Sequence, residues 1–418
     1  MGHIPTKTLE DLEYQEVLRQ CADFAITPLG KKACLELTPE VETEWIMNQL
    51  QAVSEFRASF ENENRIPNHG FESLTEVFAL LKIENSVLEV HSFRNITTNT
   101  ETTNTLISFL KKFQSYYPTL FQRCEGLTVE KEIKSSVDAV IDRFGEVRDN
   151  ASESLYSIRK KIQQLRGKIS SSFNKALSQY QTADYLDDIR ESIIDNRRVL
   201  AVKAMYRRKI KGTIMGSSKT GSIVFIEPEA THAQTQELQN LLFEEGEEIK
   251  KILSQLTDFF RPYLPYLQLQ QAFLLEMDIL YAKARYAQEI KGLLPKMETD
   301  SRELEFIKAY HPLLLQAHKL EGKITHPQDI RLDTEHRIIV ISGPNAGGKS
   351  ITLKTVGLLQ LMLQSGMLIP VHERSKACLF NRILTDIGDN QSIENHLSTY
   401  SYRLKNMKYF LRKCDQNT

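Results

Sequence analysis

The feature that most constrains the fold is the octapeptide Gly343-Pro-Asn-Ala-Gly-Gly-Lys-Ser350, which fits the pattern G-x-x-x-x-G-K-[ST] in full. An apolar run, Arg337-Ile-Ile-Val-Ile-Ser342, precedes it, and a helical pattern from Ile351 to Gly366 follows it. The apolar run predicts a buried parallel strand. A glycine-rich turn between a strand and a helix therefore predicts an α/β layer in this part of the chain.

The same loop is typical of a site for nucleotide phosphates. Its glycines let backbone N–H groups turn toward phosphate oxygens, and the helix that follows adds the positive end of its dipole. In this interpretation Lys349 neutralises the β- and γ-phosphates, and the Ser350 hydroxyl is a ligand of Mg²⁺.

A nucleotide-hydrolysing site of this class also needs an acidic residue at the end of an apolar strand, often with a glutamate beside it. After the loop, the candidate is Arg382-Ile-Leu-Thr-Asp386, which is short and has no following glutamate. We therefore expect no catalytic residue within this chain, nucleotide hydrolysis near background, and a sequence cut off inside its nucleotide-binding domain.

Two apolar seams with alternating spacings of three and four residues predict two long helices. About 50 residues separate them, and the spacing predicts that the helices pair antiparallel. Between them, the segments 198–204 and 221–227 have strand character, so we predict a small sheet at the tip of the helical pair. The seam residues are Leu155, Ile158, Ile162, Leu165, Ile169, Phe173 and Leu177, then Leu238, Leu241, Leu242, Ile249, Ile252, Leu253, Leu256 and Phe259.

The charge balance excludes a generally basic surface, because 53 lysines and arginines stand against 54 acidic residues. A site for a polyanion must therefore be local. One cluster without any acid meets this condition, and it could follow the phosphates of a nucleic acid without reading bases, since we expect no aromatic side chains among its charges. The alternative is an ordinary solvated face. The cluster consists of Arg197, Arg198, Lys203, Arg207, Arg208, Lys209 and Lys211.

The five cysteines are scattered with no C-x-x-C spacing, which argues against structural zinc and against a disulfide framework. No apolar run approaches the roughly 20 residues that span a bilayer. We therefore expect a soluble, cytoplasmic protein without a membrane partner.

Several motifs resemble the MutS family, and within it the short bacterial branch that lacks the mismatch-reading domains. The phosphate loop with the following Leu353-Lys-Thr-Val-Gly-Leu-Leu359 resembles that family's loop. The resemblance extends in order along nearly the whole chain, through Thr27-Pro-Leu-Gly30, Phe225-Ile-Glu-Pro228, Tyr281-Ala-Lys-Ala-Arg285, Tyr310-His-Pro-Leu-Leu314, Asp386-Ile-Gly-Asp-Asn-Gln-Ser-Ile393 and Leu397-Ser-Thr-Tyr-Ser401.

This resemblance implies ATP and Mg²⁺ as ligands and a homodimer through the ATPase domain. Asn345 would contact the γ-phosphate or the attacking water, and Ser398 would reach the nucleotide of the partner subunit. Ile324 and His326 are candidates for the adenine contact, whereas His311 is equally well explained as a packed turn residue. The nucleotide-binding set is Gly343, Pro344, Asn345, Ala346, Gly347, Gly348, Lys349, Ser350 and Ile351, with Ile324, His326 and, in trans, Ser398.

The resulting expectation is an α+β multidomain chain. It comprises a helical core (1–130), an ascending lever helix (131–188), a β-type clamp (189–230), descending lever helices (231–292) and part of a P-loop ATPase domain (293–418).

The function implied is ATP-driven clamping of branched, mismatched or otherwise structured DNA in repair or recombination. Mismatch recognition itself is disfavoured, because the chain opens directly with the helical core. The main alternative is a ribosome-associated ATPase acting on stalled ribosomes. A head domain of a transport or chromosome-structure ATPase fits less well.

Overall fold

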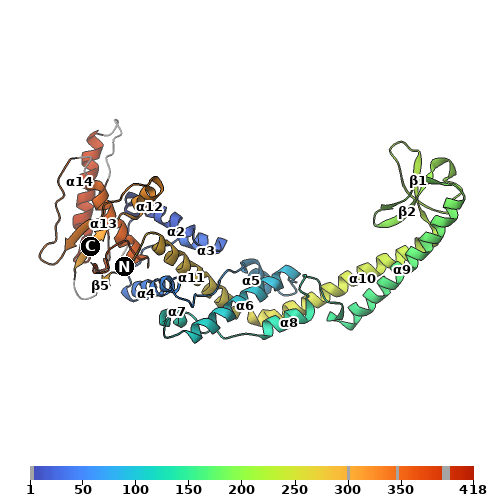
Figure 1. Cartoon of the computed structure of the whole chain (residues 1–418), viewed down its shortest axis with the longest axis horizontal. Coiled ribbons are helices and arrows are strands. Elements are labelled where there is room, and N and C mark those ends of the chain that lie inside the picture. Colours follow the sequence, from blue (N-terminus) through green and yellow to red (C-terminus); the bar gives the residue numbers. More distant parts are fainter. Residues whose placement is uncertain (1–3, 299–301, 345–347, 388–395) are drawn as a thin grey trace. The chain divides into compact units, whose positions relative to one another are not determined.

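The computed structural model describes residues 4–298, 302–344, 348–387 and 396–418, the stretch 396–403 by its backbone only. The chain divides into two compact units (Figure 1). The first comprises Met1–Leu74, Thr98–Glu130 and Pro265–Thr418, and the second comprises Thr75–Thr97 and Lys131–Leu264. Helices and strands occur in both units, which confirms the α+β class at this coarse level.

The first unit contains most of the helices and one small sheet. Its elements are α1 (Thr6–Asp11), α2 (Tyr14–Ala22), α3 (Pro28–Leu35), α4 (Thr43–Ser59), the larger part of α6 (Val90–Lys112), α7 (Pro118–Gln122), α11 (Leu264–Glu289), β5 (Lys296–Met297), β6 (Leu304–Ala309), α12 (Pro312–Glu321), β7 (Gln328–Leu332), α13 (Lys349–Gln364), β8 (Lys376–Ala377) and α14 (His396–Lys413).

The second unit consists of two long helices, shorter ones and the other sheet. Its elements are α5 (Thr75–Leu81), α8 (Glu132–Val140), α9 (Glu153–Thr182), β1 (Leu186–Ile194), β2 (Arg197–Lys203), β3 (Gly212–Ser217), β4 (Ile223–Pro228) and α10 (Glu229–Phe260). Across the described part of both units, no helix is long and apolar enough to cross a membrane.

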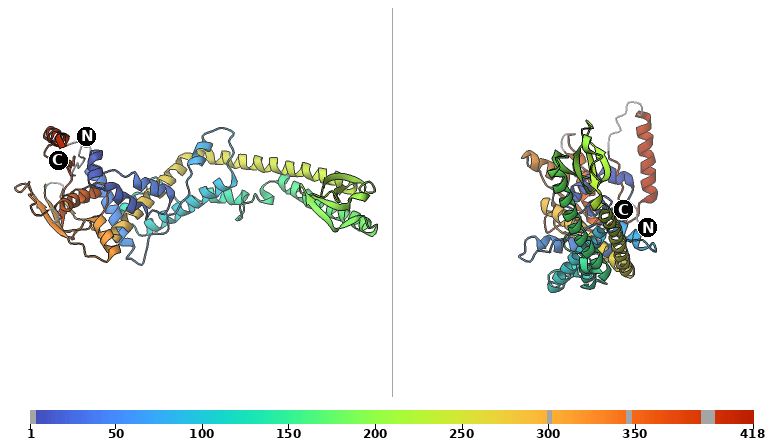
Figure 2. Two further views of the ribbon diagram at one scale, coloured as in Figure 1. Left: turned by 90° about the horizontal axis from the view of Figure 1, so that it is seen from above. Right: turned by 90° about the vertical axis from the view of Figure 1, so that its right-hand side faces the viewer.

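Helices α9 and α10 run side by side within the second unit (Figures 1 and 2). Ile162 and Leu165 of α9 pack against Leu241 of α10, so the two predicted seams face each other. About one turn nearer the start of α9, Arg159 Nε donates to Glu245 Oε1, one turn later in α10, at 2.7 Å. Because residues earlier in α9 pair with residues later in α10, the predicted antiparallel pairing is confirmed.

The sheet of the second unit is entirely antiparallel, with strand order β1-β2-β4-β3. The predicted segments 198–204 and 221–227 correspond to β2 and β4, its two central strands. The edge strands β1 and β3 were not predicted, because their sequences alternate less regularly and carry more exposed residues. The core beneath the sheet is formed by Phe173 of α9 with Leu186, Leu200, Val202, Ile210, Val224 and Ile226.

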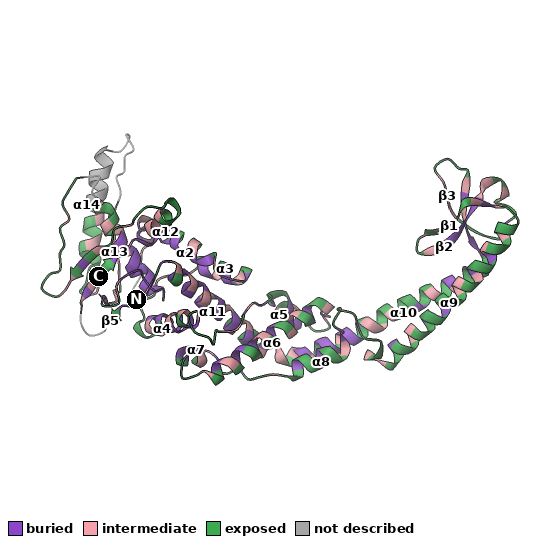
Figure 3. Cartoon of the chain, in the orientation of Figure 1, coloured by how far each residue is buried: buried purple, intermediate pink, exposed green. Residues whose placement is uncertain are grey.

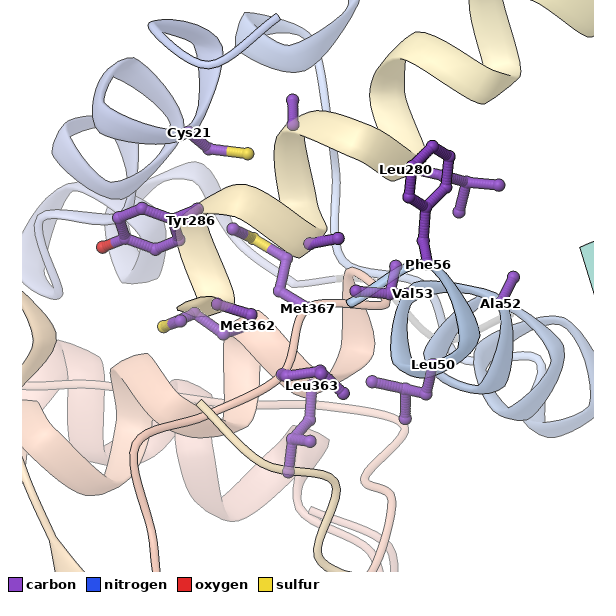
Figure 4. Close-up of a cluster of buried hydrophobic side chains, with 14 of the residues drawn as sticks. Cys21, Leu50, Ala52, Val53, Phe56, Leu280, Tyr286, Met362, Leu363 and Met367 are labelled. Carbon is purple, nitrogen blue, oxygen red and sulfur yellow. The ribbon is translucent and has the colours of Figure 1, made fainter. Parts of the chain in front are cut away.

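The core of the first unit lies where α4, α11 and α13 meet. Phe56 of α4 lies beside Leu280 of α11, and Leu50 and Val53 of α4 face the side of α13 that carries Leu363 (Figure 4). All five side chains are at most 2% exposed. In Figure 3 the later part of α13 is almost continuously buried, whereas α9 and α10 are exposed along much of their length.

A buried carboxylate organises the start of α3. Asp278 of α11 has no exposed surface, and it accepts hydrogen bonds from the amides of Ile26 and Thr27 at 2.8 and 2.9 Å and from Thr27 Oγ1 at 2.6 Å. His69 Nε2 lies 3.3 Å from the same carboxylate. Although burial alone would raise the pKa of Asp278, hydrogen bonds from His69, Thr27 and Ile26 keep it below its usual value.

The motif 27–30 forms the N-terminus of α3. Thr27 is the N-cap and accepts from the Gly30 amide at 3.0 Å, while Pro28 occupies the first helical position. A Cβ atom on Gly30 would lie 2.1 Å from Asp278 Oδ2. Glycine is required here because the carboxylate approaches the backbone so closely.

The sheet of the first unit has the order β5-β8-β6-β7. The predicted strand 337–342 is not part of it, so that prediction is wrong: Ile338 and Val340 are 83% and 86% exposed, and β7 pairs only with β6. An apolar run forms a strand only where another strand can take up its backbone hydrogen bonds. In the described part of the chain, no strand runs beside this segment. The predicted helix 351–366 is confirmed as α13.

We predict that Gly30→Ala lowers the free energy of unfolding of the first unit by about 2–4 kcal/mol, because the new methyl group displaces a buried, fully hydrogen-bonded carboxylate. Denaturant titration followed by the fluorescence of Trp45, the single tryptophan, reports this unit. Gly70→Ala is the control, since its Cβ would meet nothing closer than 3.4 Å. Equal stabilities of the two variants would contradict the role of Asp278.

Candidate functional site

The phosphate loop leads directly into α13. Gly348 is the N-cap of this helix with φ of 80°, and Gly343 has φ of 152°, conformations that favour glycine. The Lys349 ammonium donates to the carbonyl oxygen of Gly343 and thus reaches back across the loop. Asn345, Ala346 and Gly347 lie outside the described residues.

The first turn of α13 is open. Ser350 is exposed at the second helical position, and Ile351 and Leu353 are 39% and 53% exposed. The amide groups of a first helical turn have no partner within the helix, so they can bind an anion. Within the described residues, no group of three or more His, Cys, Asp or Glu side chains could hold a metal. The exposed hydroxyl of Ser350 is an oxygen ligand, the kind that Mg²⁺ prefers.

The last turn of α13 is anchored. Lys283 Nζ donates to the carbonyl oxygen of Ser365, the C-cap residue, at 2.7 Å. The Tyr14 hydroxyl donates to Ser365 Oγ at 2.5 Å. Gln364 Nε2 donates to the carbonyl oxygens of Glu40 and Phe380, at 2.8 and 2.9 Å. Lys283 is 1% exposed, and burial lowers its pKa to about 8.

Between α13, β7 and the segments 337–341 and 383–387 lies a hollow of about 500 Å³. Its lining includes Ile339 and Ile341 of the apolar run, Leu353 and Val356 of α13, and Asp386. Asp386, the acidic candidate from the sequence, lies 3.6 Å from Lys7 Nζ and accepts from Asn406 Nδ2 at 3.2 Å. The carboxylate therefore has protein partners in this structure.

The adenine candidates are not packed into this site. Ile324 is 79% exposed, and His326 is also exposed. His311 behaves as a packed residue: it is the N-cap of α12, it is 6% exposed, and burial lowers its pKa to about 4. The side chain of Ser398 lies outside the described part of the chain.

In the second unit, the basic cluster divides into two groups. Three of its members bind acidic side chains: Arg197 donates to Glu227 Oε2 at 2.9 Å, Arg198 to Glu191 Oε2 at 2.6 Å, and Lys203 to Asp184 Oδ1 at 3.0 Å. The carboxylates of these partners largely neutralise the three positive charges.

The other group lies on the connection between β2 and β3 and is exposed. It consists of Arg207, Arg208, Lys209 and Lys211. Among the described residues, no acidic side chain pairs with Arg207, Arg208 or Lys211. Within the basic cluster, these exposed side chains are the ones for which no described acid competes with an anion.

The expectation of a cluster without aromatic residues is wrong. The rings of Tyr185 and Tyr206 stack with centroids 4.7 Å apart, and Lys209 Nζ lies 5.5 and 5.6 Å from them. Tyr206 directly precedes Arg207, so the sequence held this signal. Tyr185 directly precedes β1, and only the fold brings it beside Tyr206.

Known proteins are similar to this chain over both the phosphate loop and the basic cluster. The family model described as MutS domain V matches residues 339–418, which include the phosphate loop and α13. The chain is 33% identical over 415 residues, 99% of its length, to a protein of Bacillus subtilis named "Putative endonuclease MutS2". The "Endonuclease MutS2" of Halothermothrix orenii is 31% identical over 416 residues. The chain belongs to the MutS family.

The match covers only part of these relatives. The chain spans about half the length of the curated relatives it matches, 52% for both proteins above and for the "Endonuclease MutS2" of a Geobacillus species. In this MutS-family chain, the phosphate loop and the exposed basic residues of the second unit are two candidate places for a ligand.

The anchor of α13 gives a prediction for pH. The pKa of Lys283 is about 8 in the folded chain and about 10.5 when unfolded. Between these values the unfolded chain binds a proton that the folded chain does not, so the stability contributed by this group rises with pH. Across the whole window the gain is about 3 kcal/mol.

We therefore expect the unfolding free energy of the parent, minus that of Lys283→Met, to increase from pH 7.5 to pH 9.5. Denaturant titrations followed by Trp45 fluorescence measure this difference, and other titrating groups largely cancel between the two proteins. A difference independent of pH would show that Lys283 is not buried beside Ser365 as described.

Proposed function

We propose that this chain binds ATP with Mg²⁺ at the phosphate loop and holds structured DNA at the sheet of the second unit, as part of a dimeric MutS-family protein. The observation that carries the proposal is the start of α13, where two glycines with positive φ and Lys349 surround an open helix N-terminus. This arrangement suits a nucleotide phosphate.

In the proposed complex, backbone N–H groups of the loop from Asn345 to Gly348 and the Lys349 ammonium bind the phosphates, with Ser350 at the metal. The family resemblance adds Asn345 at the γ-phosphate and Ser398 at the partner's nucleotide. Pro344, Ala346, Gly347 and Ile351 complete the loop, and Ile324 and His326 are the proposed contacts of the adenine.

The nucleic acid would lie against the exposed group Arg207, Arg208, Lys209 and Lys211. The partly neutralised Arg197, Arg198 and Lys203 would stay at the margin of such a site, because their acidic partners compete with phosphate. The rings of Tyr185 and Tyr206 offer a surface for a base or sugar beside these charges.

In this proposal α9 and α10 act as levers and the sheet of the second unit as a clamp. At a rise of 1.5 Å per residue, helices of 30 and 32 residues are about 45–48 Å long. A pair of helices that pack against each other through apolar residues, here Ile162, Leu165 and Leu241, can transmit a displacement. The relatives are named endonucleases, and none of the described residues is proposed to cleave DNA.

We predict that Lys349→Ala weakens binding of Mg·ATP at least about tenfold, because the ammonium is the largest positive charge of the loop. Fluorescence of an N-methylanthraniloyl ATP analogue measures the Kd. Lys354→Gln is the control, since it removes a charge from the same helix one turn later, where Lys354 lies 3.4 Å from Glu13. Equal affinities of parent and Lys349→Ala would refute the phosphate site.

We also predict that replacing Arg207, Arg208 and Lys211 by Ala weakens binding to a four-way DNA junction at every salt concentration. Each lost phosphate contact should flatten the slope of log K against log [salt] by about one. Lys31, Lys32 and Lys82 are exposed lysines elsewhere, and their triple Gln variant is the matched control. Coincident slopes for parent and both variants would exclude this cluster as the DNA site.

Sedimentation of the chain with purified ribosomes is the second arm of this experiment. The DNA proposal predicts that junction DNA competes with any ribosome binding through the same three side chains. Ribosome binding that survives both the triple Ala variant and excess junction DNA, together with no measurable junction binding by the parent, would favour the ribosome-associated alternative.

A further inference from the structure

A second hollow of the first unit, about 520 Å³ in volume, has no role in the proposed function. It lies between the C-terminal end of α11, β6, α12 and the segment 370–372. None of the described residues of the phosphate loop lines it. Its size is in the range of small-molecule sites, roughly 300–1,000 Å³.

The lining combines an apolar interior with exposed positive charge. Ile290 and Val371 are buried, Leu315 and the ring of Tyr310 are half-buried, and four lysines are exposed around them. The ammonium of Lys319 binds Glu289, and that of Lys323 lies 2.5 Å from Glu321. The other two lysines, Lys291 and Lys308, have no side-chain partner among the described residues.

These two lysines occupy unusual backbone conformations. Lys291 has φ of 55° and Lys308 has φ of 49°. Left-handed backbone is costly for a residue with a Cβ atom, and glycine adopts it without that cost. Non-glycine residues held in this region gather at functional sites.

At both positions the backbone has a local structure that glycine adopts readily. Lys291 closes the C-terminus of α11: the Gly292 amide donates to Ala287 O at 2.7 Å, a pattern whose left-handed residue is most often glycine. Lys308 is the extra residue of a bulge in β6, where its amide donates to Asp329 Oδ1 at 2.7 Å. Bulges re-aim side chains, commonly beside binding sites.

We propose that this hollow binds an organic phosphate of mononucleotide size. The phosphate would sit between the ammonium groups of Lys291 and Lys308, and the base or another flat apolar group would lie against Leu315, Val371 and the ring of Tyr310. Two unpaired ammonium groups and an apolar interior match an anion that has an apolar body, rather than a bare inorganic ion.

The test uses the 418-residue chain with adenosine, guanosine and thymidine 5′-monophosphates, each titrated by isothermal calorimetry. Monophosphates lack the β- and γ-phosphates that Lys349 would hold, so Lys349→Ala should bind them as the parent does. We expect a submillimolar Kd for at least one monophosphate, and weaker binding of inorganic phosphate.

The variant that removes the site is Lys291→Gly with Lys308→Gly. Glycine suits both backbone conformations, so the melting temperature should stay the same or rise while the affinity falls about tenfold or more. Lys31→Ala with Lys32→Ala removes the same charge elsewhere and should bind as the parent.

Four results would overturn the proposal. They are a Kd above about 5 mM for all three monophosphates, equal affinity for inorganic phosphate, unchanged affinity in the double glycine variant, and loss of binding in Lys349→Ala. The last result would place the monophosphate in the phosphate loop. The first three are independent of whether the chain binds ATP.

Discussion

Helix α11 stabilises the first unit by bringing buried polar side chains to backbone groups that other elements leave unpaired. Asp278 accepts the amides at the start of α3, and Lys283 donates to the carbonyl at the end of α13. A buried carboxylate or ammonium costs free energy unless hydrogen bonds satisfy it. Both groups therefore fix the helices that they contact, because each helix loses its partner if it moves.

The consequence for function is an asymmetric α13. Its C-terminal half is buried among α4 and α11 and anchored at Ser365, whereas its first turn is exposed and ends at the phosphate loop. A helix fixed at one end can hold its free amides in place before a ligand arrives, which reduces the ordering cost of binding. Nucleotide bound at Lys349 would meet a helix already held in position.

Local patterns in the sequence were sufficient to predict the helices α9, α10 and α13 and the loop before α13. The seam spacing predicted α9, α10 and their pairing, and the glycine pattern predicted where α13 begins. The resemblance to the MutS family rested on short motifs, and comparison with relatives over the whole chain supports it.

The features that could not be predicted from the sequence depend on contacts between residues that are distant along the chain. The run 337–342 has the composition of a strand, but pairing decides whether a strand forms, and no described strand pairs with it. The role of Asp278 could not be predicted, because the amides that donate to it, those of Ile26 and Thr27, lie about 250 residues earlier. The split of the basic cluster followed from acids such as Glu227 and Glu191, which reach it only through the sheet.

The central claim is that α13 is fixed at its C-terminal end and receives nucleotide at its open N-terminal end. Amide hydrogen exchange, with and without Mg·ATP, tests it most directly. In the free protein the amides of residues 358–365 should exchange slowly and those of 349–353 fast. Nucleotide should then protect 349–353 and leave 358–365 nearly unchanged. Fast exchange of 358–365 in the free protein, or protection that spreads equally along the helix, would contradict the account.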